Sequence, residues 1–272
     1  MTQRREPYLP PNTEGPEMKM LRTTLLAAIA ALIFAISAAP AQVNAAEPAV
    51  VAQSIGQTPM PRNKEYPWMT VARWQSMVAA QEARAAQGGV DLMFVGDSIT
   101  EGWKDPLWTN YFGQFHPANF GVGGDHTGNV LWRLQQGSLH LLHPKAIVLL
   151  IGVNNLNLIP ETPAQTAAGV KAVVATLRQN YPDAKILLNA VFPFAQSGSS
   201  EKRSQVKELN QAIAVLGDER HVFFRDYGSR FLDDHGDISP DVMADFLHPT
   251  QKGYQIWADA MLPDIRALMQ GQ

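Results

Sequence analysis

The sequence predicts a three-layer α/β/α protein whose centre is a flavodoxin-like, five-stranded parallel sheet in the strand order 2-1-3-4-5. Two observations lead to this fold class. Short apolar runs alternate along the chain with longer segments that carry apolar residues at helical spacing, which is typical of a parallel sheet with helices on both faces. The strongest run, Ala146–Ile151, is apolar on both faces, as a central parallel strand requires. Right-handed crossovers between about five strands then favour the flavodoxin-like order.

Five segments have the length and composition of strands, because each is a short apolar run bounded by turn-forming or polar residues. In chain order, the predicted strands are Val90–Val95, Ala118–Val122, Ala146–Ile151, Lys185–Val191 and Val222–Arg225. The second of these has a weaker apolar pattern than the first.

Helical spacing and capping residues predict the helices. The first is expected to begin at Trp68 and to end at Gly88, because glycine terminates helices. Thr162 and Gln165 form a capping box around Pro163, which predicts the start of a helix at that proline. The other helices are expected from Val130 to about Gln136, over Gln205–Leu216, and from Thr250 to the end of an apolar stripe at Leu268.

The 272 residues are interpreted as three parts. Residues 1–45 are an N-terminal extension with a signal peptide. Residues 46–67 are rich in Pro, Gln and small residues and form a linker or an arm lying on the domain. Residues 68–272 form the domain itself.

The signal peptide is predicted from a basic start, an apolar centre and a small-residue end. Lys19 and Arg22 flank the start of the apolar stretch Leu25–Ala39, which leads to small residues around Ala45. A membrane-spanning helix needs roughly 20 apolar residues, so this stretch is short for one. We therefore expect an exported protein, periplasmic or secreted, without a stable membrane anchor after cleavage. A retained anchor is the alternative.

Composition limits the chemistry. A net charge of −3 gives no reason to expect nucleic acid or an anionic membrane as a partner. The sequence has no cysteine, which excludes disulfides, a cysteine nucleophile and a thiolate metal site. The histidines outside the candidate site form no metal-spaced set, so we expect no metal and no other cofactor.

Four polar clusters are expected at one edge of the sheet. Ser98 follows the first predicted strand, Gly121–Asp125 the second and Gly152–Asn155 the third, whereas Asp245 and His248 precede the last helix. Ligands of such sheets bind beyond the carboxyl ends of the strands. We therefore expect these clusters to form one site.

These residue types match the needs of acyl transfer, which are a nucleophile, a base, a group that orients the base, and donors for an oxyanion. Ser98 is the candidate nucleophile, His248 the base and Asp245 the orienting carboxylate. The main-chain N–H groups of Ser98 and Gly124 and the side-chain amide of Asn154 are the candidate oxyanion hole. Asp97 is expected to bond N–H groups of its own turn rather than to act as an acid.

This constellation resembles the SGNH (GDSL) hydrolase family, whose Ser, Gly, Asn and His correspond to Ser98, Gly124, Asn154 and His248. The resemblance covers residues 91–260 and implies ester hydrolysis through an acyl-enzyme, with Asp245 completing a triad and with no metal.

Two further segments, 119–125 and 130–134, are most similar to the catalytic subunits of the intracellular platelet-activating-factor acetylhydrolases. Ile99 stands where many family members have Leu, and Asn155 where many have Asp, which puts the support of that loop in doubt. Those acetylhydrolases are cytosolic, whereas this chain is expected to be exported, so their phospholipid substrate is not carried over.

The sequence thus predicts a serine esterase that removes short acyl groups, acetyl foremost, from a carbohydrate or another small ester. The alternatives are a lysophospholipase or thioesterase with a longer acyl pocket, and a catalytically silent binding domain on the same fold.

Loops 103–115 and 192–201 are the candidate pocket walls. Trp103 and Trp108 would either stack on a sugar or acyl chain or pack in the core, and His126 would either line the pocket or have a structural role. Homo-oligomerisation is left open.

Overall fold

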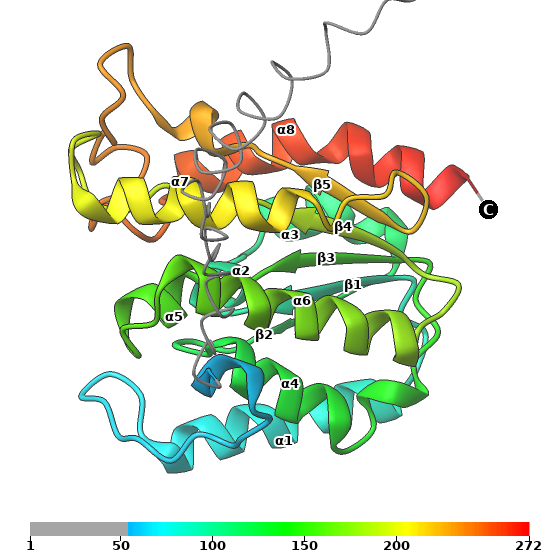
Figure 1. Cartoon of the computed structure of the whole chain (residues 1–272). Coiled ribbons are helices and arrows are strands. Elements are labelled where there is room, and N and C mark those ends of the chain that lie inside the picture. The colour runs from blue at the N-terminus through cyan, green and yellow to red at the C-terminus, as the bar shows by residue number, and fades with distance from the viewer. Residues whose placement is uncertain (1–53, 272) are drawn as a thin grey trace, which may run out of the picture. The chain divides into compact units, whose positions relative to one another are not determined.

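A five-stranded parallel sheet in the order β2-β1-β3-β4-β5 forms the centre of the protein (Figure 1). This order confirms the prediction. The computed structural model describes residues 54–271, which fall within one compact unit. The predicted signal peptide and the first part of the predicted arm lie outside the described residues. The strands are β1 (Leu92–Gly96), β2 (Pro117–Gly121), β3 (Ala146–Leu150), β4 (Lys185–Asn189) and β5 (Val222–Arg225).

The register of the strands brings their carboxyl ends to one edge. Gly96, the last residue of β1, pairs with Gly121 of β2 on one side and with Leu150 of β3 on the other. Every residue of β1 and β3 is buried, because both faces of these central strands are covered. The segments that follow β1, β2 and β3 therefore emerge side by side.

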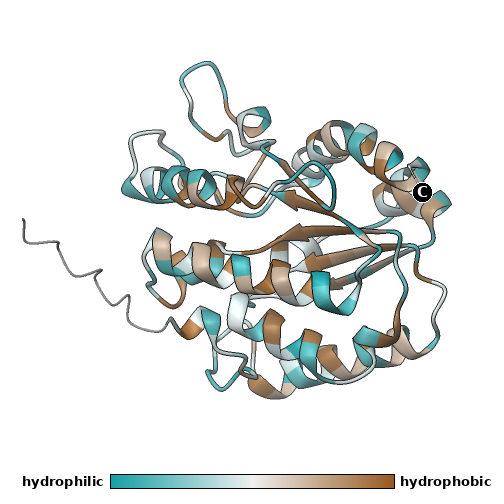
Figure 2. Ribbon diagram, turned by 45° about the vertical axis from the view of Figure 1, so that its right-hand side comes forward, coloured by the Kyte–Doolittle hydropathy of each residue, from teal (hydrophilic) through white to brown (hydrophobic). Residues whose placement is uncertain are grey.

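Helices cover both faces of the sheet, and their apolar sides face it (Figure 2). α4, α6 and α7 lie on one face, α3 and α8 lie on the other, and α1 lies beside α4 near the β2 edge (Figure 1). The α-helices are α1 (Val71–Ala86), α2 (Ser98–Glu101), α3 (Leu107–Phe112), α4 (Thr127–Gln135), α5 (Val153–Asn157), α6 (Pro163–Asn180), α7 (Glu201–Ala214) and α8 (Gln251–Gln270). The 3-10 turns are η1 (Ile55–Gln57), η2 (Gly113–Phe115), η3 (Leu139–Leu141) and η4 (Gly228–Phe231). No helix among residues 54–271 combines the length and the hydropathy needed to cross a bilayer.

The start of α1 differs from the prediction. The helix begins at Val71, and the Thr70 side chain caps it by accepting a hydrogen bond from the N–H of Arg73. Trp68 instead lies in a two-residue turn closed by reciprocal main-chain hydrogen bonds between Tyr66 and Met69, both 3.0 Å. The helical spacing of Trp68 with the later apolar residues was therefore coincidental.

Other helices also differ from their predicted bounds. α7 begins at Glu201 rather than Gln205. The prediction began too late because the first turn of this helix is polar and carries no apolar periodicity. α2, α3 and α5 were not predicted. These helices have six residues or fewer, too few to show a 3.6-residue pattern, and their stability comes from tertiary packing.

Trp103 belongs to the core, and the half-buried Trp108 packs against it. Trp103 is only 6 % exposed and packs edge-on against Phe112, and Trp108 contacts Phe94 in the same way. The Trp103 ring also lies 4.9 Å from that of Trp257 in α8. Of the two interpretations open at these tryptophans, packing is the one that the structure supports.

Candidate active site

The structure brings Ser98, His248 and Asp245 into one hydrogen-bonded chain. The Ser98 Oγ atom lies 2.8 Å from His248 Nε2, and His248 Nδ1 lies 2.7 Å from Asp245 Oδ2. Because an ionised carboxylate only accepts, Nδ1 carries the ring proton and Nε2 accepts from the Ser98 hydroxyl. This is the arrangement of a nucleophile, a base and an orienting acid.

Local structure fixes Ser98 and Asp245, the two ends of this hydrogen-bonded chain. Ser98 is the first residue of α2, and Asp97, the one residue between β1 and α2, caps that helix by accepting from the N–H of Ile99 at 3.0 Å. Asp245 accepts from the main-chain N–H of His248 at 2.7 Å as well as from its ring. Burial raises the pKa of the Asp245 carboxyl, but the hydrogen bonds from His248 outweigh this effect and leave the pKa below its ordinary value. Asp245 thus stays ionised where it must orient His248.

Three donors meet beside Ser98. The main-chain N–H groups of Ser98 and Gly124 have no hydrogen-bond partner among residues 54–271. Asn154 donates one amide hydrogen to the carbonyl of Asp125 at 2.9 Å, which leaves its second hydrogen available. Gly124 has φ +73°, and a Cβ there would lie 2.5 Å from the Trp68 ring, so only glycine fits this turn.

Two cavities open at Ser98 and His248. One, of about 390 Å³, runs along α2 and the start of α8, with Lys104 and Leu107 in its wall. The other, of about 330 Å³, contains Gly124 and Asn154. Of the two predicted wall segments, only the first contributes, because residues 192–201 line neither cavity. No group of three or more histidine, aspartate or glutamate side chains in the described chain is arranged to hold a metal ion.

Comparison with known proteins places this geometry in a family. The sequence model of the GDSL-like lipase/acylhydrolase family matches residues 94–256. The chain belongs to this family. It is also 34% identical over 185 residues to the human platelet-activating factor acetylhydrolase IB subunit alpha1, which covers 67% of this chain and 78% of the relative. The alpha2 subunit from Rattus norvegicus is 36% identical over 166 residues, 60% of this chain and 71% of the relative.

Solved structures share the fold at low identity. A putative acylhydrolase from Bacteroides fragilis superposes with a TM-score of 0.59 at 21% identity, covering 76% of this chain and 100% of the other. An acetylxylan esterase from Geobacillus stearothermophilus gives a TM-score of 0.54 at 19% identity, covering 65% and 94%. The resemblance to SGNH (GDSL) hydrolases is thereby confirmed, and the protein is an acylhydrolase.

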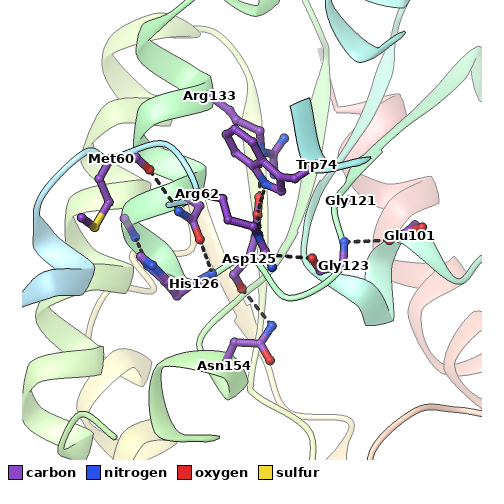
Figure 3. Close-up of polar contacts among 12 residues, drawn as sticks. Met60, Arg62, Trp74, Glu101, Gly121, Gly123, Asp125, His126, Arg133 and Asn154 are labelled. Atoms are coloured by element: carbon purple, nitrogen blue, oxygen red, sulfur yellow. Dashed lines mark hydrogen bonds and ion pairs between the residues drawn. The ribbon is translucent and has the colours of Figure 1, made fainter. Parts of the chain in front are cut away.

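Behind the glycine turn of this acylhydrolase lies the fully buried carboxylate of Asp125 (Figure 3). Its Oδ1 accepts from the indole N–H of Trp74 at 2.7 Å, and its Oδ2 accepts from Arg133 Nε at 2.8 Å. Arg62 Nη2 lies 3.5 Å from Oδ1 and donates to the Gly123 carbonyl at 2.9 Å. Burial raises the pKa of Asp125, and the guanidinium groups and the indole counter this effect.

Sequence reasoning placed Asp125 at the site but gave no role to Arg62, Trp74 or Arg133. Arg133 donates to Phe120 at the end of β2 and to Gly96 at the end of β1, at 3.0 and 3.3 Å. It therefore ties together the two strands that precede the site. The sequence did contain a sign of this role, because Arg133 stands among the apolar residues of α4. Arg62 belongs to the predicted arm, and its isolated position in the sequence gave no signal.

The departure at Asn155 has a structural role. Its side chain accepts from the N–H of Thr127 at 3.1 Å and donates to Thr127 Oγ1 and to Glu161 at 2.7 and 2.8 Å. Glu161 in turn accepts from the Ser54 hydroxyl and the Gly56 N–H. The loop is thus supported by a neutral amide that links α4 to residues 54–56 of the arm.

His126 has a structural role and lines a neighbouring cavity. Its Nδ1 accepts from the N–H of Gly128 at the start of α4, and burial lowers its pKa to about 4. The side chain faces a cavity of about 640 Å³ beneath the arm, which reaches Gly124 but not Ser98. Asp97 is buried and bonds its own turn, as expected.

Proposed function

We propose that this acylhydrolase removes short acyl groups, acetyl foremost, from a carbohydrate or another small ester, and that Ser98 carries the acyl group. The observation that carries the proposal is the continuous hydrogen-bonded chain from Ser98 through His248 to Asp245 beside three convergent donors.

The first half-reaction forms an acyl-enzyme. His248 Nε2 takes the hydroxyl proton as Ser98 Oγ attacks the ester carbonyl carbon. The carbonyl oxygen becomes an oxyanion and accepts hydrogen bonds from the N–H groups of Ser98 and Gly124 and from Asn154. When the carbon–oxygen bond to the leaving group breaks, His248 gives its proton to the departing alkoxide.

The second half-reaction returns the enzyme. Water loses a proton to His248 Nε2 and attacks the acyl carbon, the same donors stabilise the second oxyanion, and the proton passes to Ser98 Oγ as the acid leaves. Asp245 keeps the ring oriented throughout and favours its protonated form in both transition states.

Short substrates are favoured by the walls of the site. Both cavities at Ser98 mix polar and apolar side chains, with Lys104, Asp105 and Gln251 in one and Arg73, Glu101 and Asn157 in the other. A long acyl chain would need a continuous apolar tunnel. The aromatic residues that follow β1 fill the core instead of lining such a tunnel. The names of two compared proteins, an acetylhydrolase and an acetylxylan esterase, also specify acetyl groups.

The export predicted from residues 1–45 completes the proposal. An exported enzyme would meet esters of the periplasm or the extracellular space rather than intracellular phospholipids. The lysophospholipase or thioesterase alternative would need an apolar acyl site, and polar side chains interrupt the walls of both cavities.

Two p-nitrophenyl esters test the acyl preference, because the acetate and the dodecanoate share one leaving group. We expect the acetate to have the higher kcat/KM by at least tenfold. Ser98→Ala should lower kcat by several orders of magnitude, about 10⁶ in a well-studied serine protease. Ser204→Ala, an exposed serine on α7, is the control and should retain full activity. Preference for dodecanoate would refute the short-acyl proposal, and activity that survives Ser98→Ala would refute the nucleophile.

A further inference from the structure

Trp68 is an exposed aromatic residue beside the proposed nucleophile. Among the four large hydrophobic residues that are exposed in the described chain, Trp68, at 48 %, is the only aromatic one. It lines the 330 Å³ cavity together with Ser98 and His248. An indole left in water does not contribute the free energy that its burial would add to folding. An exposed ring beside a proposed nucleophile therefore indicates a surface that contacts a ligand.

The Trp68 ring is held in place before any ligand arrives. The turn that carries it is closed by the two hydrogen bonds between Tyr66 and Met69, and Met69 is only 2 % exposed. The Trp68 and Tyr66 rings stack with centroids 5.0 Å apart and planes 17° apart. A preformed aromatic face binds a ligand with little loss of side-chain entropy.

The ring stands directly over the proposed oxyanion hole. A Cβ placed on Gly124 would lie 2.5 Å from Trp68 Cη2, so the indole edge touches the residue whose N–H is to bind the oxyanion. Three polar side chains, Arg73, Glu101 and Asn157, line the same cavity. Glu101 is fixed there because its Oε2 accepts from the N–H of Gly123 at 2.6 Å.

We propose that Trp68 is the platform on which one saccharide ring of the substrate stacks while its ester lies at Ser98. This inference rests on the proposed function and narrows its substrate class to acetylated carbohydrates. The C–H groups on one face of a pyranose carry slight positive charge, which the negative face of an indole attracts. The sugar hydroxyls would exchange hydrogen bonds with Arg73, Glu101 and Asn157.

The cavity at Trp68 has the size of a small-molecule site. Small-molecule sites span about 300–1,000 Å³, and the cavity at Trp68, about 330 Å³, is at the lower end of that range. The second cavity, along α2 and α8, then remains for the acyl group.

A quaternary ammonium group is the other ligand that an exposed tryptophan could bind. Such cations are held in cages of several aromatic faces. Trp68 is the only Trp, Tyr or Phe side chain that lines this cavity, and Arg73 and Glu101 contribute opposite charges to it, so neither an aromatic cage nor a net negative charge is available for a cation. A neutral ring with hydroxyl groups therefore fits better than a choline ester.

The test compares three acetyl esters: a monoacetylated methyl xylopyranoside, ethyl acetate and acetylcholine. The quantity measured is the ratio of kcat/KM for the saccharide to kcat/KM for ethyl acetate, which has no ring to stack. We expect Trp68→Ala to lower this ratio at least tenfold, and Trp68→Phe to retain most of it. Leu141→Ala removes another exposed apolar side chain, one that lines neither cavity at Ser98, and should leave the ratio unchanged.

Each other outcome has a distinct meaning. Wild-type enzyme that cleaves ethyl acetate but not the saccharide would overturn both the proposed substrate class and the platform. Wild-type enzyme that cleaves the saccharide, with an unchanged ratio in Trp68→Ala, would overturn the platform alone, and Trp68 would then only support Gly124. A preference for acetylcholine that is lost in Trp68→Ala would show a cation site in its place.

Discussion

Arg62 Nη2 donates to the main-chain carbonyl of Gly123 at a distance of 2.9 Å. A residue of the predicted arm therefore holds the turn that presents the Gly124 N–H to Ser98. Arg62 is 5 % exposed, and its Nε and Nη1 atoms are buried without hydrogen-bond partners in the described chain. Its polar contacts are made by Nη2, which reaches Gly123 and Asp125, and its guanidinium carbon lies 5.4 Å from the centre of the Tyr66 ring.

Arg62→Met is expected to lower kcat at least tenfold and to change KM little, because the variant misplaces an oxyanion donor, which acts in the transition state. Steady-state kinetics on p-nitrophenyl acetate measure kcat and KM separately. Arg230→Met, an exposed arginine, is the control. A thermal midpoint that falls while kcat stays at the wild-type value would show that Arg62 only stabilises the fold.

The buried pair of Arg133 and Asp125 gives a prediction about stability. Arg133→Met leaves the Asp125 carboxylate with the more distant Arg62, and removing one partner of a buried pair typically costs about 3–5 kcal/mol of unfolding free energy. We expect the double variant Asp125→Asn, Arg133→Met to recover part of this loss, because the uncompensated charge is gone. Urea denaturation of the four proteins of this cycle measures the coupling. Additive losses would contradict it.

Asp97 should make stability depend on pH. Burial raises the pKa of Asp97 from its ordinary value of 3.8 to about 7. Between these two pH values, the folded protein holds a proton on Asp97 that the unfolded chain has released. The contribution of Asp97 to the free energy of unfolding is therefore fully present below pH 3.8 and is lost as the pH rises through about 7.

Asp97→Asn removes this titration and keeps an oxygen to accept from Ile99. We expect the unfolding free energy of the variant, relative to wild type, to rise between pH 5 and pH 8. The rise should be on the order of 1.4 kcal/mol for each pH unit crossed between pH 5 and the folded-state pKa of Asp97. Chemical denaturation at several pH values measures the difference. Parallel curves for the variant and wild type would contradict it, and Asp183→Asn, on the surface, is the control.

Much of the fold could be predicted because local patterns encode it. The capping box at Thr162, with Pro163 following, starts α6 as expected, and Thr250 caps α8. Gly88 has φ +65° and follows α1, as a helix-ending glycine should. Predictions failed where the pattern was too short or was overridden, as in α2, α3 and α5 and at the start of α1.

The sequence by itself determined the fold class and the candidates Ser98, Gly124, Asn154, Asp245 and His248, because periodicity and the residues at the ends of strands are local properties. The strand order followed from the handedness of the crossovers, which is general to such sheets. Only the tertiary structure decided what surrounds them. Ser98 and His248 are 150 positions apart and meet 2.8 Å from each other because of the sheet topology. The exposure of Trp68 and the burial of Arg62 depend equally on distant contacts, which the spacing of residues along the chain does not encode.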